Sequence, residues 1–352
     1  MDRIRILHVI FSSRIAGSER YCIDLARRQA ARGCEVHVAT ASDSPLREAL
    51  GPAVIFHGLA LPLFRGMRVR RLARRIRADV CHGHLSAACK ALGRLQGPMK
   101  TVATLHVGYK THQHGRLDGV ICVNHGQAAR LGGYGGKVRT IPNWLPELAP
   151  RPVATGLRAE LGLPAGTWLV GSVGRLHPSK GMDVLVKAFR AAAPGNAALV
   201  IAGDGRQRAE LERLRAGDPR IHFLGYRSDI ESCLRDLDLF VSPSREESFG
   251  LAILEAMSTG LPVLATSSEG PAEFLRDQPV ELVEPGSCAA LGAALKRASL
   301  GHRPGVLKRV EYDLSAFDPA RRVAGILDFY AEVGSRPRPQ TETPVAALAL
   351  AQ

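Results

Sequence analysis

The sequence predicts an α/β protein made of two doubly wound, Rossmann-like domains that face a central cleft. Apolar runs with strand character alternate with helix-forming stretches in both halves of the 352-residue chain. This order implies parallel strands and right-handed crossovers, with ligands bound at the carboxyl edge of each sheet. The length is sufficient for two domains with separate cores.

A proline-rich stretch, residues 144–156, is the best candidate for a linker. We therefore expect an N-terminal domain over residues 1–150 and a C-terminal domain over residues 151–315. Residues 316–334 contain an amphipathic helix. The tail, residues 335–352, contains proline and threonine, and we expect it to be disordered.

The first half opens with a βαβ unit. Residues 4–11 predict a buried strand, and residues 19–32 predict a helix that Gly33 would end. Residues 35–40 predict the second strand. A tight loop containing Gly17 joins the first strand to the helix, and by itself this glycine is consistent with an ordinary strand-to-helix turn.

The densest basic run is RGMRVRRLARRIR, residues 65–77. Val69, Leu72 and Ile76 recur at helical spacing, so an apolar stripe would seat this helix while the arginines project from its other faces. Such a helix can attract an anionic lipid surface, and it is equally consistent with an ordinary solvated face.

Three further predicted strands of the first half end in polar residues; they cover residues 79–84, 102–106 and 119–124. Ligands bind at the carboxyl edge of a parallel sheet, and His106 lies at such an end. His82 and His84 could form a pair of metal ligands, but their spacing places no third ligand beside them. Residues 137–143 predict the last strand of this domain.

The second half opens with a strand that runs from Trp168 into Gly174 and Arg175, and Lys180 precedes a helix over residues 182–193. Two cations five residues apart on a strand–helix loop can clamp a diphosphate, with Arg as a bidentate donor and Lys as a point charge. The segment is not a Walker P-loop, because G-x-x-x-x-G-K-[ST] is absent.

Residues 242–255, SPSREESFGLAILE, join another strand to a helix. A proline stops the strand, and strong helix formers follow Gly250. A helix start offers unpaired N–H groups and a positive dipole end. An anion is therefore favoured near Phe249, Gly250 and Leu251.

Two carboxylates flank this helix start. Glu247 would repel a bare phosphate, so we expect it to face a neutral, hydroxyl-rich group. Glu255 lies about five residues inside the helix, roughly 7 to 8 Å along its axis. A sugar, a diphosphate and a ribose in a row would fit this spacing, whereas either glutamate alone could be a solvated surface residue.

These residues resemble the paired-glutamate signature of family 4 retaining glycosyltransferases. The GRLHPSKG segment at residues 174–181 is similar to the family's G-R-x-x-x-x-K-G diphosphate loop. Residues 203–205 resemble its G-D-G element near the nucleotide, and residues 221–226 resemble the segment whose backbone reads the base. The matches extend over residues 168–286.

The resemblance implies a GT-B architecture, in which the last helix crosses back to the first domain, and it implies roles for single residues. Arg175 and Lys180 would stabilise the departing diphosphate, and Glu247 would hold sugar hydroxyls. His106 would lie against the donor sugar near the reacting carbon. The other donor-binding residues implied in this way are Gly17, Gly174, Gly205, Tyr226, Phe249, Gly250, Leu251 and Glu255, the last of which would hold the ribose.

The predicted function is that of a retaining glycosyltransferase. It would move a hexose-type sugar from a UDP- or GDP-linked donor to a glycan or glycolipid acceptor, in bacterial lipopolysaccharide, capsule or exopolysaccharide synthesis. We expect no metal and no cofactor, because the D-x-D sequence at Asp236 and Asp238 is better explained as a strand entry.

Two other classes of protein are alternatives. A nucleotide-sugar epimerase shares this architecture and these donors, but it would convert the donor without an acceptor. A basic nucleic-acid-binding protein is disfavoured by an aromatic content of 5% and by the lack of a recognised binding motif. We therefore expect no nucleic-acid partner.

The formal net charge of +14 is distributed unevenly. Residues 1–150 hold 23 Lys and Arg against 9 Asp and Glu, whereas residues 151–352 hold 24 of each kind. A polyanionic partner would therefore meet the N-terminal half. An anionic membrane surface, an acidic glycan and nucleic acid are the partners that this charge alone would suit.

The seven cysteines form no C-x-x-C pair and mostly occur in apolar runs, as expected for free thiols in a reducing cytosol. The first apolar run is too short for a signal peptide, and no segment approaches about 18 uninterrupted apolar residues. We expect a cytoplasmic protein whose membrane contact, if any, is peripheral.

Overall fold

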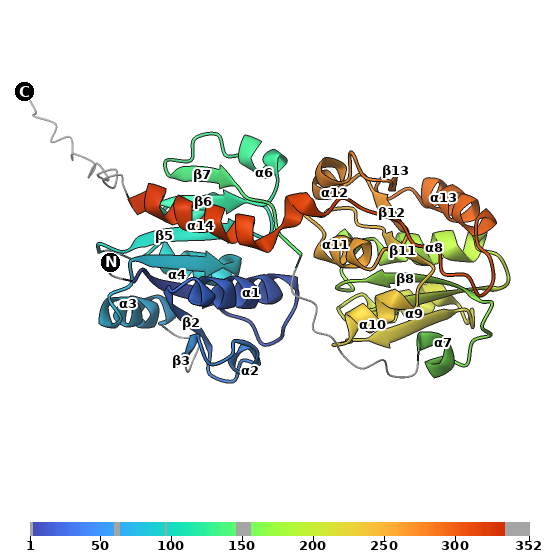
Figure 1. The fold of residues 1–352 in the computed structure, drawn as a ribbon, viewed down its shortest axis with the longest axis horizontal. Helices are drawn as coiled ribbons and strands as arrows, with labels where there is room; N and C mark the ends of the chain where they lie inside the picture. The colour runs from blue at the N-terminus through green and yellow to red at the C-terminus, as the bar shows by residue number, and fades with distance from the viewer. Residues whose placement is uncertain (1–2, 60–63, 96, 146–155, 335–352) are drawn as a thin grey trace, which may run out of the picture.

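The computed structural model describes residues 3–59, 64–95, 97–145 and 156–334. These residues form two α/β units that lie side by side, each with a parallel sheet between helices (Figure 1). The α/β fold class predicted from the alternation of strands and helices is confirmed.

The first unit has a seven-stranded sheet in the order β3-β2-β1-β4-β5-β6-β7, and every pairing is parallel. The chain moves outward from β1 to β3 and then returns to β4, on the other side of β1. This reversal forms a topological switch point, the place where open parallel sheets bind ligands. Its elements are β1 (Arg5–Ile10), α1 (Gly17–Ala31), β2 (Glu35–Ala41), α2 (Leu46–Ala49), β3 (Ile55–Leu59), α3 (Arg65–Arg75), β4 (Val80–His84), α4 (Leu85–Leu92), β5 (Lys100–Leu105), α5 (Thr111–His114), β6 (Gly119–Cys122), α6 (His125–Ala129) and β7 (Lys137–Thr140).

The second unit repeats this plan with a six-stranded parallel sheet in the order β10-β9-β8-β11-β12-β13. Its switch point lies between β8 and β11. The elements are α7 (Leu157–Glu160), β8 (Trp168–Val173), η1 (Pro178–Lys180), α8 (Met182–Ala192), β9 (Ala197–Ala202), α9 (Arg208–Arg215), β10 (Ile221–Gly225), α10 (Ile230–Arg235), β11 (Leu239–Ser242), α11 (Leu251–Ser258), β12 (Val263–Thr266), α12 (Glu269–Phe274), β13 (Glu281–Val283), α13 (Cys288–Leu300) and η2 (Ser315–Phe317). The chain then continues into α14 (Pro319–Gly334).

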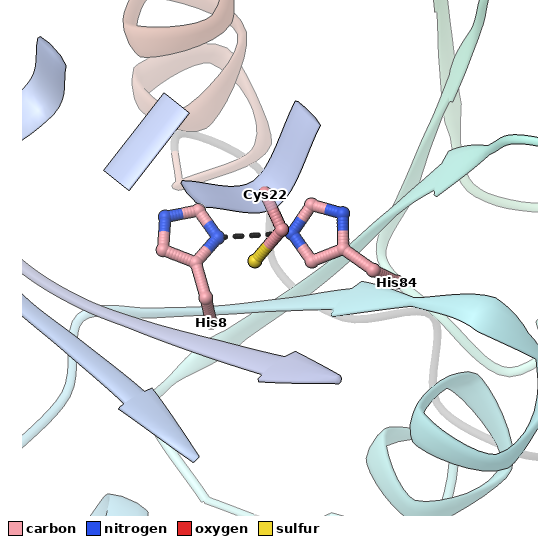
Figure 2. A group of neighbouring side chains, drawn as sticks. All are labelled: His8, Cys22 and His84. Atoms are coloured by element: carbon pink, nitrogen blue, oxygen red, sulfur yellow. Dashed lines mark hydrogen bonds between the residues drawn. The ribbon is translucent and has the colours of Figure 1, made fainter. Parts of the chain in front are cut away.

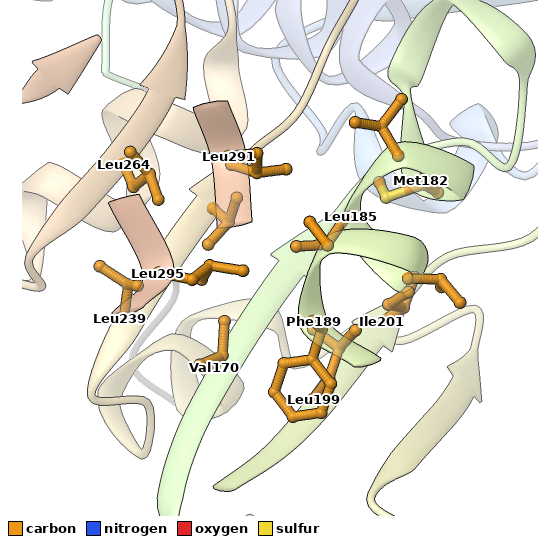
Figure 3. Packing of buried hydrophobic residues seen from close by; sticks show 14 of the residues in the cluster. Val170, Met182, Leu185, Phe189, Leu199, Ile201, Leu239, Leu264, Leu291 and Leu295 are labelled. Carbon is orange, nitrogen blue, oxygen red and sulfur yellow. The ribbon is translucent and has the colours of Figure 1, made fainter. Parts of the chain in front are cut away.

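Each sheet has an apolar layer on both faces, because successive residues of a strand point in opposite directions. In β1, Leu7 and Val9 pack with residues of α3 and α4, whereas Ile6 and Ile10 pack with residues of α1. In the second unit, Val170 of β8 belongs to a core with α8 and α13 (Figure 3). Strands buried on both faces read as continuous apolar runs, which is why they could be predicted.

The last helix, α14, packs on the first sheet rather than on the second (Figure 1). Phe329 and Tyr330 are fully buried there among residues of β1, β4, β5 and α1. Gly119 of β6 permits this contact, because a Cβ at that position would lie 2.9 Å from the Phe329 ring. Lys137 of β7 holds Glu332 in an ion pair at 3.2 Å. The chain therefore connects the two units a second time through α14.

The predicted linker, residues 144–156, includes Trp144, but Trp144 is part of the first unit. Its side chain is buried, its ring lies 4.6 Å from that of Tyr21, and its indole N–H donates to the Asp24 carboxylate. The remainder of the predicted linker, residues 146–155, and the predicted tail, residues 335–352, lie outside the described residues.

Glu269 begins the short helix α12, which extends to Phe274. Pro271 is compatible with a helix at this place, because the N–H groups of the first turn have no partner within the helix.

The predicted basic helix forms as α3. Val69 and Leu72 are buried, and Ile76, which caps the helix, is half-buried, so the predicted apolar stripe is confirmed. Among the described residues, no helix combines the length and the apolar character that crossing a membrane requires.

Candidate active site between the two units

The predicted site residues gather at the carboxyl ends of the strands, where the two units meet. The loops after β8 and β11 carry Lys180 and Glu247. The loop after β1 leads to Gly17, and His106 directly follows β5. Both switch points therefore contribute to one region.

Two loops of the second unit approach each other closely. Gly181 has a φ of 64°, and a Cβ there would lie 2.0 Å from the carbonyl oxygen of Pro243. The backbone N–H groups of Arg245 and Glu246 both donate to the carbonyl oxygen of Ser179, at 2.8 and 3.0 Å. The glycine of the K-G motif is therefore required so that the β8 loop can lie against the β11 loop.

An ion pair reinforces this contact. The Arg245 guanidinium donates to both carboxylate oxygens of Asp183 on α8, at 2.7 Å each, and to the Pro178 carbonyl oxygen at 2.9 Å. The same guanidinium holds the pKa of the Asp183 carboxyl below its usual range. Because Asp183 and Pro178 already accept these hydrogen bonds, Arg245 stabilises the contact of the two loops and is not placed to bind an incoming anion.

Lys180 and Glu247 form an ion pair across the joined loops. Their side chains are 21% and 16% exposed, so water screens the pair only in part. Arg175, the other predicted diphosphate ligand, is exposed, and no described residue accepts a hydrogen bond from its side chain. Arg206, directly after the G-D-G turn, was not predicted and adds a cation 3.0 Å from the Nε2 atom of His177.

The start of α11 lies next to Glu247. Gly250 has a φ of 102°, and a Cβ there would lie 2.9 Å from the Ile253 side chain and 3.4 Å from that of Glu247. The helix can begin here because this residue is glycine. Phe249 turns its ring into a cluster of phenylalanines, with centroids 4.9 and 6.0 Å away. It therefore contributes its backbone to the loop and its side chain to the core.

The helices α1 and α11 face each other across the junction. A Cβ on Gly17 would lie 3.5 Å from Leu251, and Arg20, one turn further along α1, donates to Glu255 at 2.6 Å. Glu255 is buried, and this burial raises the pKa of its carboxyl although Arg20 opposes the shift. Arg20 was not predicted. A basic residue one turn after the Gly17 loop is the signal that could have indicated it.

The remaining predicted donor-binding residues have different surroundings. A Cβ on Gly205 would lie 2.4 Å from the carbonyl oxygen of Leu176, so this glycine lets two strand-end loops pack together. A Cβ on Gly174 would lie 3.4 Å from the end of the Met182 side chain, which is an ordinary contact, so packing does not require a glycine here. Tyr226 is 63% exposed, and its hydroxyl donates to the carbonyl oxygen of Ile15 in the first unit at 3.4 Å.

His106 is half-buried and connects to the interior of the first unit. Its ring stacks on that of His84 with centroids 5.5 Å apart and meets Tyr21 edge-on at 4.9 Å. The Nε2 atom of His106 lies 3.2 Å from Nδ1 of His84, and Nε2 of His84 lies 3.0 Å from Nδ1 of His8. His82, predicted beside His84, instead lies within hydrogen-bond distance of two hydroxyl groups.

Two family models match the chain. Residues 15–146 match the model described as Glycosyltransferase Family 4, and residues 168–299 match the model described as Glycosyl transferases group 1. The lipopolysaccharide core biosynthesis glycosyltransferase LpsE of Rhizobium meliloti is 31% identical over 288 residues, which cover 78% of this chain and 82% of the relative. The chain belongs to glycosyltransferase family 4.

Several solved structures share its fold. The Anabaena protein HepE in complex with UDP and glucose has a TM-score of 0.77 at 21% identity, over 94% of this chain and 100% of HepE. WaaG, a glycosyltransferase involved in lipopolysaccharide biosynthesis, has a TM-score of 0.64 at 19% identity, over 94% of each chain. The predicted GT-B architecture of the glycosyltransferase is thus confirmed.

One group of side chains in the glycosyltransferase has the composition of a metal site. His8, Cys22 and His84 each place a ligand atom within 4.8 Å of the others (Figure 2). All three are buried, and burial raises the pKa of the Cys22 thiol and lowers that of His8 to about 4. A metal would need the thiolate, which this burial disfavours. The sequence did not indicate the group, because its members are far apart along the chain.

The D-x-D residues of the glycosyltransferase have structural roles. Asp236 accepts a hydrogen bond from the backbone N–H of Leu157. Asp238 accepts from Arg158 at 2.6 Å and from the Leu169 N–H at 2.7 Å. Both carboxylates lie before β11, at the amino edge of the sheet, and they hold α7 and the start of β8.

The buried histidines predict how stability depends on pH. Burial lowers the pKa of His8 to about 4, whereas an unfolded histidine titrates near 6.5. Below about pH 6.5 the unfolded chain therefore binds more protons than the folded chain. The contribution of His8 to the free energy of unfolding should be complete above that pH and should decrease as the pH falls toward 4. For His8 alone the loss should be on the order of 2 kcal/mol at pH 5.

Urea unfolding at pH 7.5, 6 and 5 measures this loss. His8→Phe should show a shallower decline than the parent protein, because carboxylates titrate equally in both. Identical slopes would show that His8 is not held neutral by burial.

Proposed function

We propose that this glycosyltransferase moves a hexose-type sugar from a UDP- or GDP-linked donor to a glycan or glycolipid of the bacterial surface. The transfer would retain the anomeric configuration and need no metal. The observation that carries the proposal is the Lys180–Glu247 pair beside the start of α11. It sets a cation, a carboxylate and a helix N-terminus at one sheet edge, as a diphosphate followed by a sugar would require.

The names of similar proteins support these substrates. The solved structures of HepE contain UDP, glucose and UDP-glucose. Curated relatives include two lipopolysaccharide core glycosyltransferases of Rhizobium meliloti and a GDP-mannose-dependent alpha-mannosyltransferase of Mycobacterium tuberculosis. We therefore infer a nucleotide diphosphate hexose as donor and a lipopolysaccharide-type glycan as acceptor.

Departure of the nucleotide diphosphate builds negative charge on its terminal phosphate. Arg175, Lys180 and the amide groups at the start of α11 would stabilise that charge more in the transition state than in the ground state. The diphosphate would take over the contact of Lys180, and sugar hydroxyls would take over that of Glu247. Glu247 would thus hold the sugar and not act as a nucleophile.

We assign Glu255 to the ribose of the donor. Its carboxylate is already oriented by Arg20, a residue of the first unit. Ribose binding would therefore involve both units, and closure of the two units on the donor would exclude water from the reaction. Gly17, Tyr226 and His106 would line the same region.

The roles of Lys180 and Glu247 can be separated by substitution. Glu247→Gln should lower turnover at least tenfold with little change in UDP or GDP affinity, because the sugar contact is lost. Lys180→Ala should weaken UDP or GDP binding by more than about 1 kcal/mol, as for a charge-assisted contact. Transfer to lipopolysaccharide acceptors and calorimetry measure the two effects.

Glu246→Gln is the matched control, since Glu246 is the exposed neighbour of Glu247, and it should retain turnover. Equal turnover in Glu247→Gln and the control would remove the assigned role. Conversion of the donor without an acceptor would favour the epimerase alternative.

Metal independence is tested by chelation. Excess EDTA should leave transfer unchanged, because under the proposal Arg175, Lys180 and the amide groups at the start of α11 would supply the positive charge that the departing diphosphate needs. Loss of transfer that added Mg²⁺ or Mn²⁺ restores would contradict this part of the proposal.

We further propose that the first unit contacts an anionic membrane through the α3 surface, defined as Phe64, Met67, Arg71, Arg74 and Arg75. Phe64 and Met67 are 70% and 57% exposed, and the three arginines are exposed on the same face. Exposed apolar residues beside arginines suit an interface between lipid headgroups and acyl chains.

Vesicles that contain anionic lipid should bind the protein at low ionic strength and release it as salt rises. Arg71→Glu/Arg75→Glu should reduce this binding at least fivefold. Arg276→Glu/Lys296→Glu makes the same charge change on exposed residues of the second unit and should leave binding unchanged. Equal loss in both variants would indicate an unspecific effect of net charge and refute the α3 surface.

A further inference from the structure

A chain of hydrogen bonds runs from His106 into the first unit. It passes from His106 to His84 at 3.2 Å, to His8 at 3.0 Å and to the Gln29 carbonyl oxygen at 2.7 Å. The Gln29 amide nitrogen then donates to the Tyr330 hydroxyl at 3.3 Å. The strands β1 and β4, the residue that follows β5, and the helices α1 and α14 thus contribute to one connected network.

Burial makes this network directional. His8, Gln29 and His84 are 0% exposed, and burial lowers the pKa values of both histidines. A neutral imidazole has one N–H group and one lone pair, so it donates through one nitrogen and accepts through the other. The direction of any one link therefore fixes the direction of every other link.

Gln29 sets that direction. Its carbonyl oxygen faces Nε2 of His8, so His8 donates there and accepts at Nδ1 from the Nε2–H of His84. His84 then accepts at Nδ1 from the Nε2–H of His106. This assignment follows from the orientation of the Gln29 amide, and reversing the amide would reverse each donor and acceptor.

The last link leaves a lone pair on the Nδ1 atom of His106. No described residue forms a hydrogen bond with that atom. His106 is half-buried and directly follows the carboxyl end of β5, on the sheet edge that carries the candidate site. A sugar hydroxyl is a donor that an Nδ1 lone pair would accept.

We propose that Gln29, His8 and His84 are positioning residues that hold His106 as its Nε2-protonated tautomer, so that Nδ1 accepts a hydrogen bond from a hydroxyl of the donor sugar. This inference rests on the proposed function, which puts the donor sugar beside His106. The contact of 3.0 Å between His8 and His84 agrees with a hydrogen bond. Two nitrogens that share a tetrahedral zinc ion lie farther apart, about 3.3 Å.

The tautomer is measured directly by long-range ¹H–¹⁵N correlation spectra of the full chain labelled with ¹⁵N-histidine. The chemical shift distinguishes a protonated ring nitrogen from one with a lone pair, and His106→Gln identifies the signals of His106. In the parent protein, His106 should carry its proton on Nε2. Gln29→Leu removes the acceptor and should yield a mixture of tautomers or the reversed one.

Two variants serve as controls. Gln29→Glu, when its buried carboxyl is protonated, keeps an acceptor toward His8 and a donor toward Tyr330, so it should restore the parent tautomer. His37→Phe breaks another histidine pair, His37 with His57 at 2.9 Å. That pair lies on the opposite face of the sheet, since His37 is in register with Leu7, and its loss should leave His106 unchanged. His8→Phe interrupts the chain at a second place if Gln29→Leu fails to fold.

Kinetics with UDP-glucose and GDP-mannose as donor probes complete the test. Gln29→Leu should raise the donor KM roughly three- to tenfold, as expected for one neutral hydrogen bond, with a smaller change in kcat. A proton on Nδ1 of His106 in the parent protein, or an unchanged tautomer in both Gln29→Leu and His8→Phe, would overturn the proposal. Full turnover of His106→Ala would instead refute the role of His106 in the proposed function, whatever its tautomer.

Discussion

The close approach of the β8 loop to the β11 loop is the constraint on which the site depends. Gly181 lets the two backbones meet, and the Ser179 carbonyl oxygen accepts two N–H groups from the partner loop. Both loops leave the sheet at its switch point, so this contact brings Lys180 and Glu247 within ion-pair distance. A side chain at Gly181 would force the loops apart. The position of the two charged residues therefore depends on the glycine.

A second constraint comes from the burial of Glu255. A buried carboxylate is costly unless a cation or several donors satisfy it, and here the cation is Arg20 of the first unit. The first unit also supplies the side chain of Asn124, which donates to the Ser248 carbonyl oxygen at 2.6 Å. The loop and helix that carry the two glutamates are thus held by both units. The site belongs to the junction rather than to the second unit alone.

The strands and the charged loops could be predicted, because parallel strands buried on both faces read as apolar runs and because Lys180 and Glu247 stand at fixed offsets from glycines. Trp144 and Arg20 could not, since each is defined by a partner far away in sequence, Asp24 and Glu255 respectively. The histidine chain was hidden for the same reason. The register of the sheet brings the histidines together. It pairs His8 with His82, so that His84 lies two residues further along the neighbouring strand.

The two units differ in the charge of the groups that lie near the candidate site. The first unit holds all of the excess positive charge, yet beside β1 it buries neutral imidazoles, since burial lowers the pKa values of His8, His82 and His84. The second unit presents Lys180, Arg175 and the start of α11 instead.

A nucleotide sugar is charged at its diphosphate and neutral at its sugar. Under the proposed function, electrostatics would direct the diphosphate to the second unit, while uncharged acceptors on the first unit would select hydroxyls without attracting phosphate. The orientation of the donor would then follow from the placement of charge, and shape would be needed only to choose among sugars.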